Sequence, residues 1–449
     1  MVKNGTVSRN DTQYEQLASE YLIPAAPLLD EAATQAHNLY NRALYDVRQA
    51  FFKRQYINSF TDLNTLFKKR YESKENMLYH KLGYVQSAQQ TLREVMTIWQ
   101  AWFKVLKAYR KNPARFTGRP RMPRYLHKSQ RHTFYVTNQN AQIVRKDEQD
   151  KGYLVIKKLG IKIKLASADI KKIGRVAFKP VANGYKVIVP YKTKQKIKYL
   201  PDNGKYLGID PGIDNAFACV SNTGARPLLI NGRGIKSVNQ YYNKKRSELK
   251  RLQAKYHQLE KLISTKQGLK PVYQETKAMK RITAWRNDKI RQFAHKASKR
   301  IVDYALSCDA NTIVIGKNKS WKRSFEMGKR NNQNFIGIPH QVMIDMIKYK
   351  ANLAGITVIQ TNESYTSQTS ALDHEQPCWN NGNKSRKKQR KSPVNRRIKR
   401  GLFKADNGTL INADINGALQ IIKKVFPNFS LDDGIVGAVL RPFKWSPTI

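Results

Sequence analysis

The order of apolar runs and helical periodicities after residue 206 limits the possible folds more than any other feature of this sequence. The expected strands are Tyr206–Asp210, Phe217–Val220, Pro227–Ile230, Thr312–Gly316 and Ile356–Gln360, and the expected helices are Val238–Ile263, Ile290–Leu306, Gln341–Ala354 and one starting near Ala413. Short apolar strands that alternate with helices favour a sheet with parallel pairs, because a parallel connection needs a crossover of a dozen residues or more. We therefore predict an α/β fold for this half of the chain.

The first half of the chain carries two different patterns. Apolar residues recur at helical spacing within 31–112, most clearly in Val85–Lys107, and Pro113 ends this block. A basic segment rich in Pro and Gly follows, and short alternating runs then predict a small β-barrel or sandwich. Residues 1–30 are mixed in character. The predicted segments are 1–30, 31–112, 113–203 and 204–449, and residues 1–30 either belong with the strands of 113–203 or are left uncertain.

The charge balance indicates a polyanionic partner. Lys and Arg number 83 against 32 Asp and Glu, which gives a formal net charge of +51 at pH 7. Nucleic acid is the usual partner of such a chain, because each neutralised phosphate releases a counterion. An anionic membrane is the competing partner, but no apolar run reaches the roughly 18 residues of a membrane-spanning helix. The first residues also lack the apolar core of a signal peptide, so we expect a cytoplasmic protein with no membrane partner.

Isolated acidic residues at predicted strand ends indicate metal-dependent chemistry on phosphodiesters. Two-metal hydrolysis needs a few carboxylates at one end of a sheet, where they hold two Mg²⁺ ions about 4 Å apart. Asp210 ends a strand before a Pro-Gly turn, Glu363 follows the strand Ile356–Gln360, and Asp414 opens the last helix. Each has a plain alternative: a turn Asp, a surface Glu, and a first-turn Asp that interacts with the helix dipole.

Four motifs in one order carry a resemblance to a known family. They are Phe116-Thr-Gly-Arg-Pro-Arg-Met-Pro-Arg-Tyr125, Gly208-Ile-Asp210-Pro-Gly212, Tyr365-Thr-Ser-Gln368 and Asn412-Ala-Asp414-Ile-Asn416-Gly-Ala418. In turn, they resemble the helix-to-barrel connector, the first RuvC motif, the start of the zinc ribbon and the third RuvC motif of transposon-encoded TnpB proteins and the related type V CRISPR effectors. The resemblance covers about residues 35–425.

This resemblance implies a multidomain α/β protein. Its RNase H-like (RuvC) nuclease core would follow an N-terminal helical recognition lobe and a β-barrel wedge domain, with a basic insertion at 365–411 in place of a zinc ribbon. The implied activity is that of a prokaryotic, nucleoid-associated, RNA-guided endonuclease. Such an enzyme cuts double-stranded DNA beside a short adjacent motif and leaves a 3′-hydroxyl and a 5′-phosphate. The implied cofactors are a guide RNA and two Mg²⁺ ions, for which Mn²⁺ can substitute, held by Asp210, Glu363 and Asp414.

One departure from the family concerns its second RuvC motif, which usually ends a strand with Glu. Here the matching strand reads Ile313-Val-Ile-Gly316, so a glycine stands at the carboxylate position. The resemblance extends to family members with a relocated Glu, which makes Glu363 the expected third ligand. Glu326, on the loop after the same strand, is the alternative.

A second departure concerns zinc. The Cys pairs of the family's zinc ribbon are missing, and only Cys378 is present in that region. Cys219 and Cys308 are far away in the sequence, and hydroxyl groups do not replace thiolates on a structural zinc. We therefore expect no zinc.

Polar side chains in the first half are candidates to read the adjacent motif, because Asn and Gln can bond adenine through two hydrogen bonds. The candidates are Gln86, Gln89 and Gln90 in the helical segment and Thr137, Asn138 and Gln139 in the segment of strands. Ordinary surface polar residues are the alternative interpretation. Expected contacts to the nucleic-acid backbone are Arg119, Arg121, Arg124, Lys244, Lys245, Arg246, Arg396, Arg397, Lys399 and Arg400.

Two other functions remain open at this point. A nuclease-dead, RNA-guided DNA-binding protein that acts as a repressor is favoured by Gly316 and opposed by Glu363. A transposase of this fold would share the carboxylates, although the TnpB-like N-terminal half argues against it. The sequence does not distinguish a guide derived from a transposon end from one derived from a CRISPR array.

Overall fold

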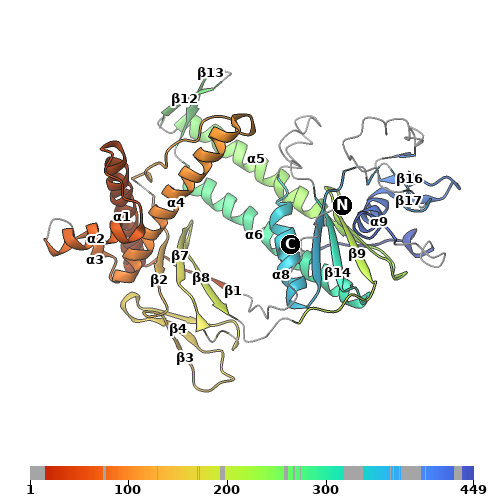
Figure 1. The fold of residues 1–449 in the computed structure, drawn as a ribbon, viewed down its shortest axis with the longest axis horizontal. Coiled ribbons are helices and arrows are strands. Elements are labelled where there is room, and N and C mark those ends of the chain that lie inside the picture. The colour runs from red at the N-terminus through yellow and green to blue at the C-terminus, as the bar shows by residue number, and fades with distance from the viewer. Residues whose placement is uncertain are drawn as a thin grey trace. The chain divides into compact units, whose positions relative to one another are not determined.

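The chain forms two compact units, Gln13–Lys196 and Met1–Thr12 with Ile197–Ile449 (Figure 1). The structure is a computed structural model. It describes residues 16–448 except 74–76, 129, 169, 171, 193–197, 257–260, 266–267, 274, 318–336, 365, 368, 374, 376–395, 400 and 429–436, and for 261–272 it describes the backbone only. None of the helices in these described ranges is both long enough and apolar enough to cross a membrane.

The unit Gln13–Lys196 combines helices with two small sheets. Its helices are α1 (Pro27–Phe52), α2 (Phe60–Glu72), α3 (Leu78–Lys81) and α4 (Val85–Lys111), and its strands are β1 (Gln16–Ile23), β2 (Phe134–Val136), β3 (Gln142–Val144), β4 (Tyr153–Ile156), β5 (Ile161–Lys164), β6 (Lys172–Ile173), β7 (Val176–Val181) and β8 (Gly184–Lys192). Ser59 caps α2 through a capping box with Asp62, which satisfies free backbone N–H groups at the helix start.

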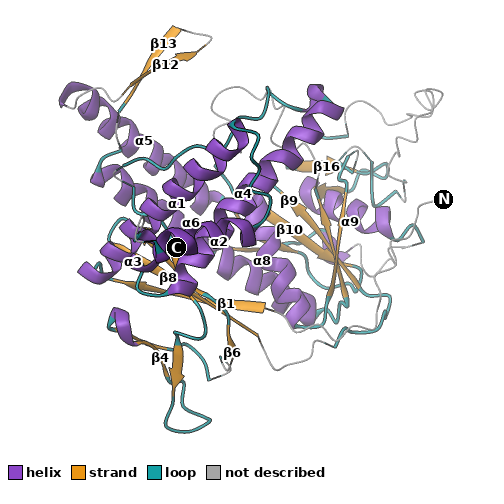
Figure 2. Ribbon diagram, turned by 60° about the vertical axis from the view of Figure 1, so that its left-hand side comes forward, coloured by secondary structure: helices purple, strands orange, loops and turns teal. Residues whose placement is uncertain are grey.

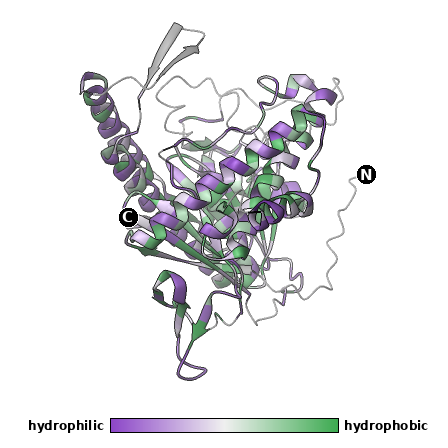
Figure 3. Ribbon diagram, turned by 90° about the vertical axis from the view of Figure 1, so that its left-hand side faces the viewer, coloured by the Kyte–Doolittle hydropathy of each residue, from purple (hydrophilic) through white to green (hydrophobic). Residues whose placement is uncertain are grey.

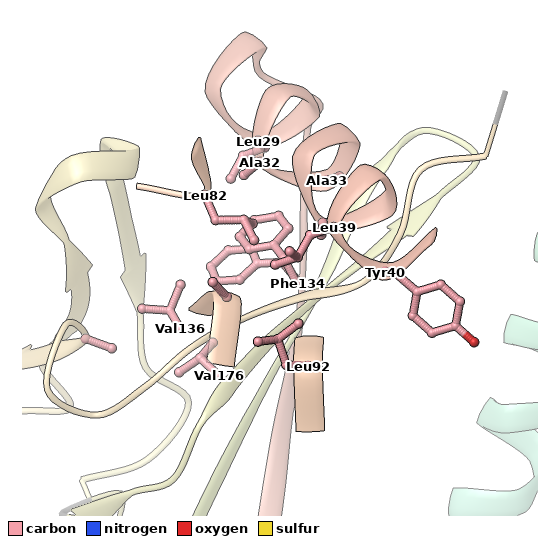
Figure 4. Packing of buried hydrophobic residues seen from close by; sticks show 14 of the residues in the cluster. Leu29, Ala32, Ala33, Leu39, Tyr40, Leu82, Leu92, Phe134, Val136 and Val176 are labelled. Atoms are coloured by element: carbon pink, nitrogen blue, oxygen red, sulfur yellow. The ribbon is translucent and has the colours of Figure 1, made fainter. Parts of the chain in front are cut away.

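The expected barrel is not found among the described strands. One sheet has the order β1-β8-β7-β2, with β6 also paired to β8, and the second has the order β3-β4-β5. A barrel requires that the outer strands of a sheet pair with each other, and β2 does not pair back to β1 in this part of the chain. Helices α1 and α4 instead cover the first sheet. Their residues Leu39 and Leu92 join Phe134 and Val176 in one buried cluster (Figure 4).

The second unit is built on a six-stranded sheet with the order β15-β14-β9-β10-β11-β18. These strands are β9 (Tyr206–Pro211), β10 (Asn215–Ser221), β11 (Leu228–Asn231), β14 (Thr312–Gly316), β15 (Thr357–Thr361) and β18 (Phe443–Trp445), and the helices are α5 (Arg233–Tyr256), α6 (Lys277–Ser307), α8 (His340–Leu353) and α9 (Ala413–Val425). Two hairpins complete it, β12 (Lys261–Thr265) with β13 (Gly268–Val272) and β16 (Leu402–Lys404) with β17 (Leu410–Asn412).

Helices cover both faces of this sheet (Figure 2). Strand β14 is parallel to β9 and β15, whereas β9, β10 and β11 are antiparallel neighbours. Leu207 and Ile209 of β9 pack with α6 and α8 on one face, and Ala218 and Val220 of β10 pack with α9 on the other. The ribbon coloured by hydropathy shows purple and green alternating along the helices, as expected for helices with one buried face (Figure 3).

Two helices of this unit begin or end at other residues than the sequence predicted. Helix α6 starts at Lys277, thirteen residues before the predicted start at Ile290, because its first turns are polar and carry little periodicity. The predicted helix to Ile263 ends at Tyr256, and a hairpin takes its last residues.

Candidate active site

Asp210 lies at the end of the central strand β9, on the face that α9 covers. Side chains alternate along a strand, so Asp210 shares this face with Gly208. A Cβ on Gly208 would lie 2.2 Å from the Ala418 carbonyl oxygen, and a Cβ on Gly417 would lie 2.7 Å from Oδ2 of Asp210. The small residues therefore let α9 approach β9 closely and place the Asp210 carboxylate against the helix.

Asp414 lies in the first turn of α9, where two asparagine side chains bond to it. The Asn412 side chain caps the helix and accepts hydrogen bonds from the backbone N–H of Asp414 at 3.0 Å and of Ile415 at 3.2 Å. The Asn215 side chain donates a hydrogen bond of 2.8 Å to Oδ2 of Asp414. The sequence analysis missed Asn215. It stands just after the turn that follows Asp210, and the antiparallel pairing of β9 with β10 brings it back beside the motif.

Glu363 follows β15, the strand that pairs in parallel with β14. Gly316 at the end of β14 is paired with Thr361, and a Cβ on Gly316 would lie 3.2 Å from the Cβ of Glu363. The Glu363 side chain therefore starts beside the position where the family's second motif carries its carboxylate. The two positions are spatial neighbours although they belong to different strands.

The contacts of these residues follow one face of α9. Asp414, Gly417, Ile421 and Lys424 are spaced three or four residues apart, which places them on one side of a helix. Asp210 lies against Gly417, and a Cβ on Gly316 would lie 2.5 Å from Ile421 Cδ1. The Lys424 ammonium bonds to the backbone on both sides of Glu363.

Burial raises the pKa of two of these carboxyl groups, Asp210 and Glu363. Burial raises the pKa of Asp210 well above its usual range, and the charges of Asp414 and Glu363 raise it further, whereas Arg397 lowers it. Burial raises the pKa of Glu363 to about 7, against the opposing effect of Lys424. Carboxylates that repel one another in a buried place favour a bound cation, since a cation offsets both burial and repulsion.

The chemistry of these donors fits Mg²⁺, which prefers oxygen ligands and is held by few protein groups. The three side chains are nevertheless not gathered into a closed cage. Among the described residues, no group of three or more His, Cys, Asp or Glu is arranged to hold a metal ion. The helix rise of about 1.5 Å per residue explains this, because Asp414 and Ile421 lie roughly 10 Å apart along α9.

The insertion that starts at residue 365 is tied together by an arginine. Arg396 is 9% exposed and its guanidinium pairs with three carboxylates: Asp373 at 3.1 Å, Glu375 at 2.9 Å, and Asp406. We call these four residues the Arg396 cluster. The guanidinium of Arg396 is engaged within the protein, which argues against the predicted contact of this residue with a phosphate backbone.

The same insertion is anchored to α9. The buried amide of Asn416 accepts from the Ala371 N–H at 2.8 Å and donates to the Thr369 carbonyl at 2.8 Å, and Gln420 donates to the Glu375 carbonyl at 3.1 Å. Of the other residues considered in the sequence, Glu326, Tyr365, Gln368, Cys378 and Arg400 lie outside the described residues.

The candidate motif-reading residues belong to the unit Gln13–Lys196, and all three glutamines form hydrogen bonds within it. Gln86 accepts a hydrogen bond of 3.1 Å from Asn140, in the turn after β2, and Gln90 accepts one of 2.8 Å from Arg175. Gln89 donates to the Tyr79 hydroxyl at 3.3 Å. The remaining candidates lie in the same turn as Asn140. Thr137 is half-buried there, and Asn138 and Gln139 are exposed. The structure thus brings the two predicted groups together, because α4 meets this turn.

The expected backbone contacts are mostly at the surface. Arg119, Arg121, Arg124, Lys244, Arg397 and Lys399 are exposed, and Lys245 and Arg246 are half-buried. Lys245 pairs with Glu248 at 3.0 Å, and Arg246 lies over the ring of Tyr242 at 5.9 Å from its centroid.

The comparisons with known proteins agree with the sequence motifs. Residues 188–322 match the family model of a probable transposase, OrfB_IS605, and residues 340–421 match the model of the Cas12f1-like TNB domain. A search of curated proteins found no match. These family matches define the class: the chain is related to transposon-encoded proteins and to compact type V CRISPR effectors. Both matches agree with the resemblance to TnpB proteins and type V CRISPR effectors that the sequence motifs indicated.

Two solved structures are similar over most of the chain. A cryo-EM structure of a Cas12f1–sgRNA–target DNA complex is 16% identical, covers 91% of this chain and 98% of that chain, and has a TM-score of 0.32. CasPhi-2 (Cas12j) bound to crRNA and phosphorothioate-DNA is 10% identical, covers 94% and 92%, and has a TM-score of 0.46. At these TM-scores the similarity supports no residue assignment.

Proposed function

We propose that this protein is an RNA-guided DNA endonuclease that hydrolyses phosphodiester bonds of target DNA beside a short adjacent motif, with Mg²⁺ as the metal. The observation that carries the proposal is the common location of Asp210, Glu363 and Asp414 along one face of α9. Three carboxylates at the ends of neighbouring strands and at a helix start are what two-metal hydrolysis requires. The family matches and the net charge of +51 support the same conclusion.

In this proposal, Asp210, Glu363 and Asp414 hold the metal. Mg²⁺, when bound, supplies Lewis-acid activation of the attacking water and of the leaving oxygen. Asn215 fixes the orientation of the Asp414 carboxylate through its hydrogen bond of 2.8 Å, and Gly417 leaves the space that Asp210 occupies. The close packing of α9 on β9 keeps water away from one side of the carboxylates, which strengthens their attraction for a cation.

The guide RNA and double-stranded target DNA are the proposed partners. Base pairing with the guide would read the sequence, and the protein would read only the adjacent motif. The exposed turn with Asn138 and Gln139, next to Gln86 on α4, is the proposed place of that reading. Arg119, Arg121 and Arg124 are exposed in the connector after α4 and are proposed to bind phosphates. The proposed place of action is the cytoplasm, on nucleoid DNA.

The test uses the full-length protein with the RNA that copurifies with it and a plasmid that carries the complement of that RNA. We expect cleavage with Mg²⁺ and none with EDTA. Asp210→Ala and Asp414→Ala should each abolish cleavage and keep DNA binding in a gel-shift assay, because both residues act in the chemical step. Asp303→Ala is the matched control, since Asp303 is a surface residue of α6 paired only with Lys299 in the ion pairs described.

Binding without cleavage by the wild-type protein would instead identify the nuclease-dead repressor. Cleavage at the wild-type rate by either carboxylate variant would overturn the assignment at that position.

A further inference from the structure

A buried lysine lies beside Glu363 although the proposed reaction gives it no role so far. Lys424, in the last turn of α9, is 7% exposed. Its ammonium donates a hydrogen bond of 2.6 Å to the Asn362 carbonyl and one of 2.8 Å to the Ser364 carbonyl. One cation therefore holds the backbone on both sides of Glu363.

The carbonyl between these two is held as well. The Glu363 carbonyl accepts hydrogen bonds from the Thr366 backbone N–H at 3.2 Å and from its hydroxyl at 2.8 Å. The Asn362 side chain accepts from the Ser364 N–H at 2.8 Å. The carbonyls of Asn362, Glu363 and Ser364 thus all have hydrogen-bond partners. These bonds fix the backbone of the loop after β15 at Glu363, the residue that would bind the metal.

This clamp compensates for the unusual location of the carboxylate. Glu363 stands two residues beyond the end of β15, so the hydrogen bonds of the sheet do not fix it as they fix Asp210 within β9. A buried ammonium is costly unless it is paired and hydrogen-bonded, and here the hydrogen bonds go to the two carbonyls that flank Glu363. The charge of Lys424 also favours the ionised form of that carboxylate.

We propose that Lys424 is a positioning residue for Glu363: its two hydrogen bonds hold the Asn362–Ser364 loop so that the relocated carboxylate faces Asp210. The inference rests on the proposed function. It adds a residue of α9 that acts through another residue, and it explains how one helix serves both ends of the site. Asp414 is in its first turn, and Lys424 is in its last.

The neighbouring lysine offers a matched control. Lys423 is in the same turn of α9 and is 6% exposed. Burial lowers its pKa, as it does for Lys424, but the opposing charge comes from Glu375 in the insertion and not from Glu363. The same substitution at the two positions removes a buried cation from the same turn, and the hydrogen bonds to the carbonyls on both sides of Glu363 come from Lys424.

The experiment compares Lys424→Met, Lys424→Arg and Lys423→Met in the full chain with its copurifying RNA. Mutation of groups that support a metal ligand typically costs 10–100-fold in metal affinity. We expect Lys424→Met to raise the Mg²⁺ concentration for half-maximal plasmid cleavage at least about tenfold. It should also weaken Mn²⁺ binding, measured by electron paramagnetic resonance without DNA, by a similar factor. Lys424→Arg should recover part of both, and Lys423→Met should match the wild type.

Two results would overturn the inference. One is a wild-type Mg²⁺ dependence and Mn²⁺ affinity for Lys424→Met. The other is an equal shift for Lys423→Met, which would indicate a general effect on α9. If Lys424→Met does not fold, Lys424→Gln carries the test, because it removes the charge and keeps a donor for one carbonyl. Failure of the proposed function is distinguished from these by Asp210→Ala, whose wild-type cleavage would refute that function whatever Lys424 does.

Discussion

Gly316 allows a sharp test of the relocated carboxylate, because the structure shows what a side chain there would meet. Strand β14 is buried along its whole length. A Cβ on Gly316 would lie 2.5 Å from Ile421 Cδ1, 3.1 Å from Ile421 Cγ1 and 3.2 Å from the Cβ of Glu363. Carbon atoms pack best at roughly 3.5–4.0 Å, so Gly316→Ala would require Ile421 to move by about 1 Å. Ile421 is fully buried and cannot turn into solvent.

Overpacking of this kind costs about 1–3 kcal/mol. We therefore expect Gly316→Ala to lower the free energy of unfolding by about 2 kcal/mol and to slow cleavage, because the Glu363 backbone must also shift. Ile421→Val removes the Cδ1 atom in question and by itself should cost about 1 kcal/mol. The double variant should be more stable than the sum of the single effects implies, and a double-mutant cycle in urea denaturation measures that difference.

Gly401→Ala is the control, since a Cβ at Gly401 would have no atom within 4 Å. The reasoning is refuted if Gly316→Ala is as stable and as active as the wild type, or if its cost is the same with and without the Ile421 methyl group. The same crowding affects a variant that moves the carboxylate from position 363 back to position 316, where the family usually carries it. Gly316→Glu should restore activity in the Glu363→Gln background only together with a smaller residue at 421, because positions 316 and 363 share one space.

Three further predictions concern charge. Glu363→Gln keeps the size of the side chain and removes its charge. Cleavage should therefore fall as far as in Asp210→Ala, while the melting temperature stays near that of the wild type. Normal cleavage would indicate another metal ligand, and Glu326 would be the next residue to test. Arg396→Met should lower the free energy of unfolding by about 1–3 kcal/mol, because it removes a buried guanidinium whose charged hydrogen bonds go to three partly exposed carboxylates. The substitution Lys399→Met, at an exposed position, should have little effect in the same denaturation assay. The purified protein should carry RNA at low salt, and its affinity should fall at least about a thousandfold between 50 and 200 mM salt, measured by filter binding; protein that is free of RNA and insensitive to salt would contradict the role of the net charge.

The sequence predicted those features that rest on local pattern. Asp210 and Asp414 were predicted as candidate ligands because one ends an apolar strand and the other opens a helix, and both patterns are visible within a few residues. Asn215 and Lys424 were not found, because their roles come from contacts between residues that are far apart in the chain, at separations of 199 and about 60 residues. Strand β1 was also missed, since its pairing with β8 joins residues 16–23 to 185–192 and a short mixed segment carries no trace of a distant partner.

Arg396 illustrates a different limit of sequence interpretation. A dense run of Lys and Arg indicates phosphate binding, and nothing in that run distinguishes the one arginine that folds inward. Its partners Asp373 and Glu375 are about twenty residues earlier, and Asp406 is ten residues later. The composition describes the segment as a whole. Whether a single arginine is buried depends on the carboxylates that lie near it in the fold.

The Arg396 cluster also makes this region a candidate site for inserting foreign sequence. Its ion pairs join Arg396 to Asp373 and Glu375, so the described residues on either side of 376–395 lie close together. The entropy of closing a loop grows only slowly with its length, by about 0.6 kcal/mol for each doubling. A tag or a small reporter domain placed between 376 and 395 would therefore burden folding little while the cluster stays intact. Such an insertion would also test whether this segment supports α9. Asn416 and Gln420 connect the segment to this helix, which carries Asp414.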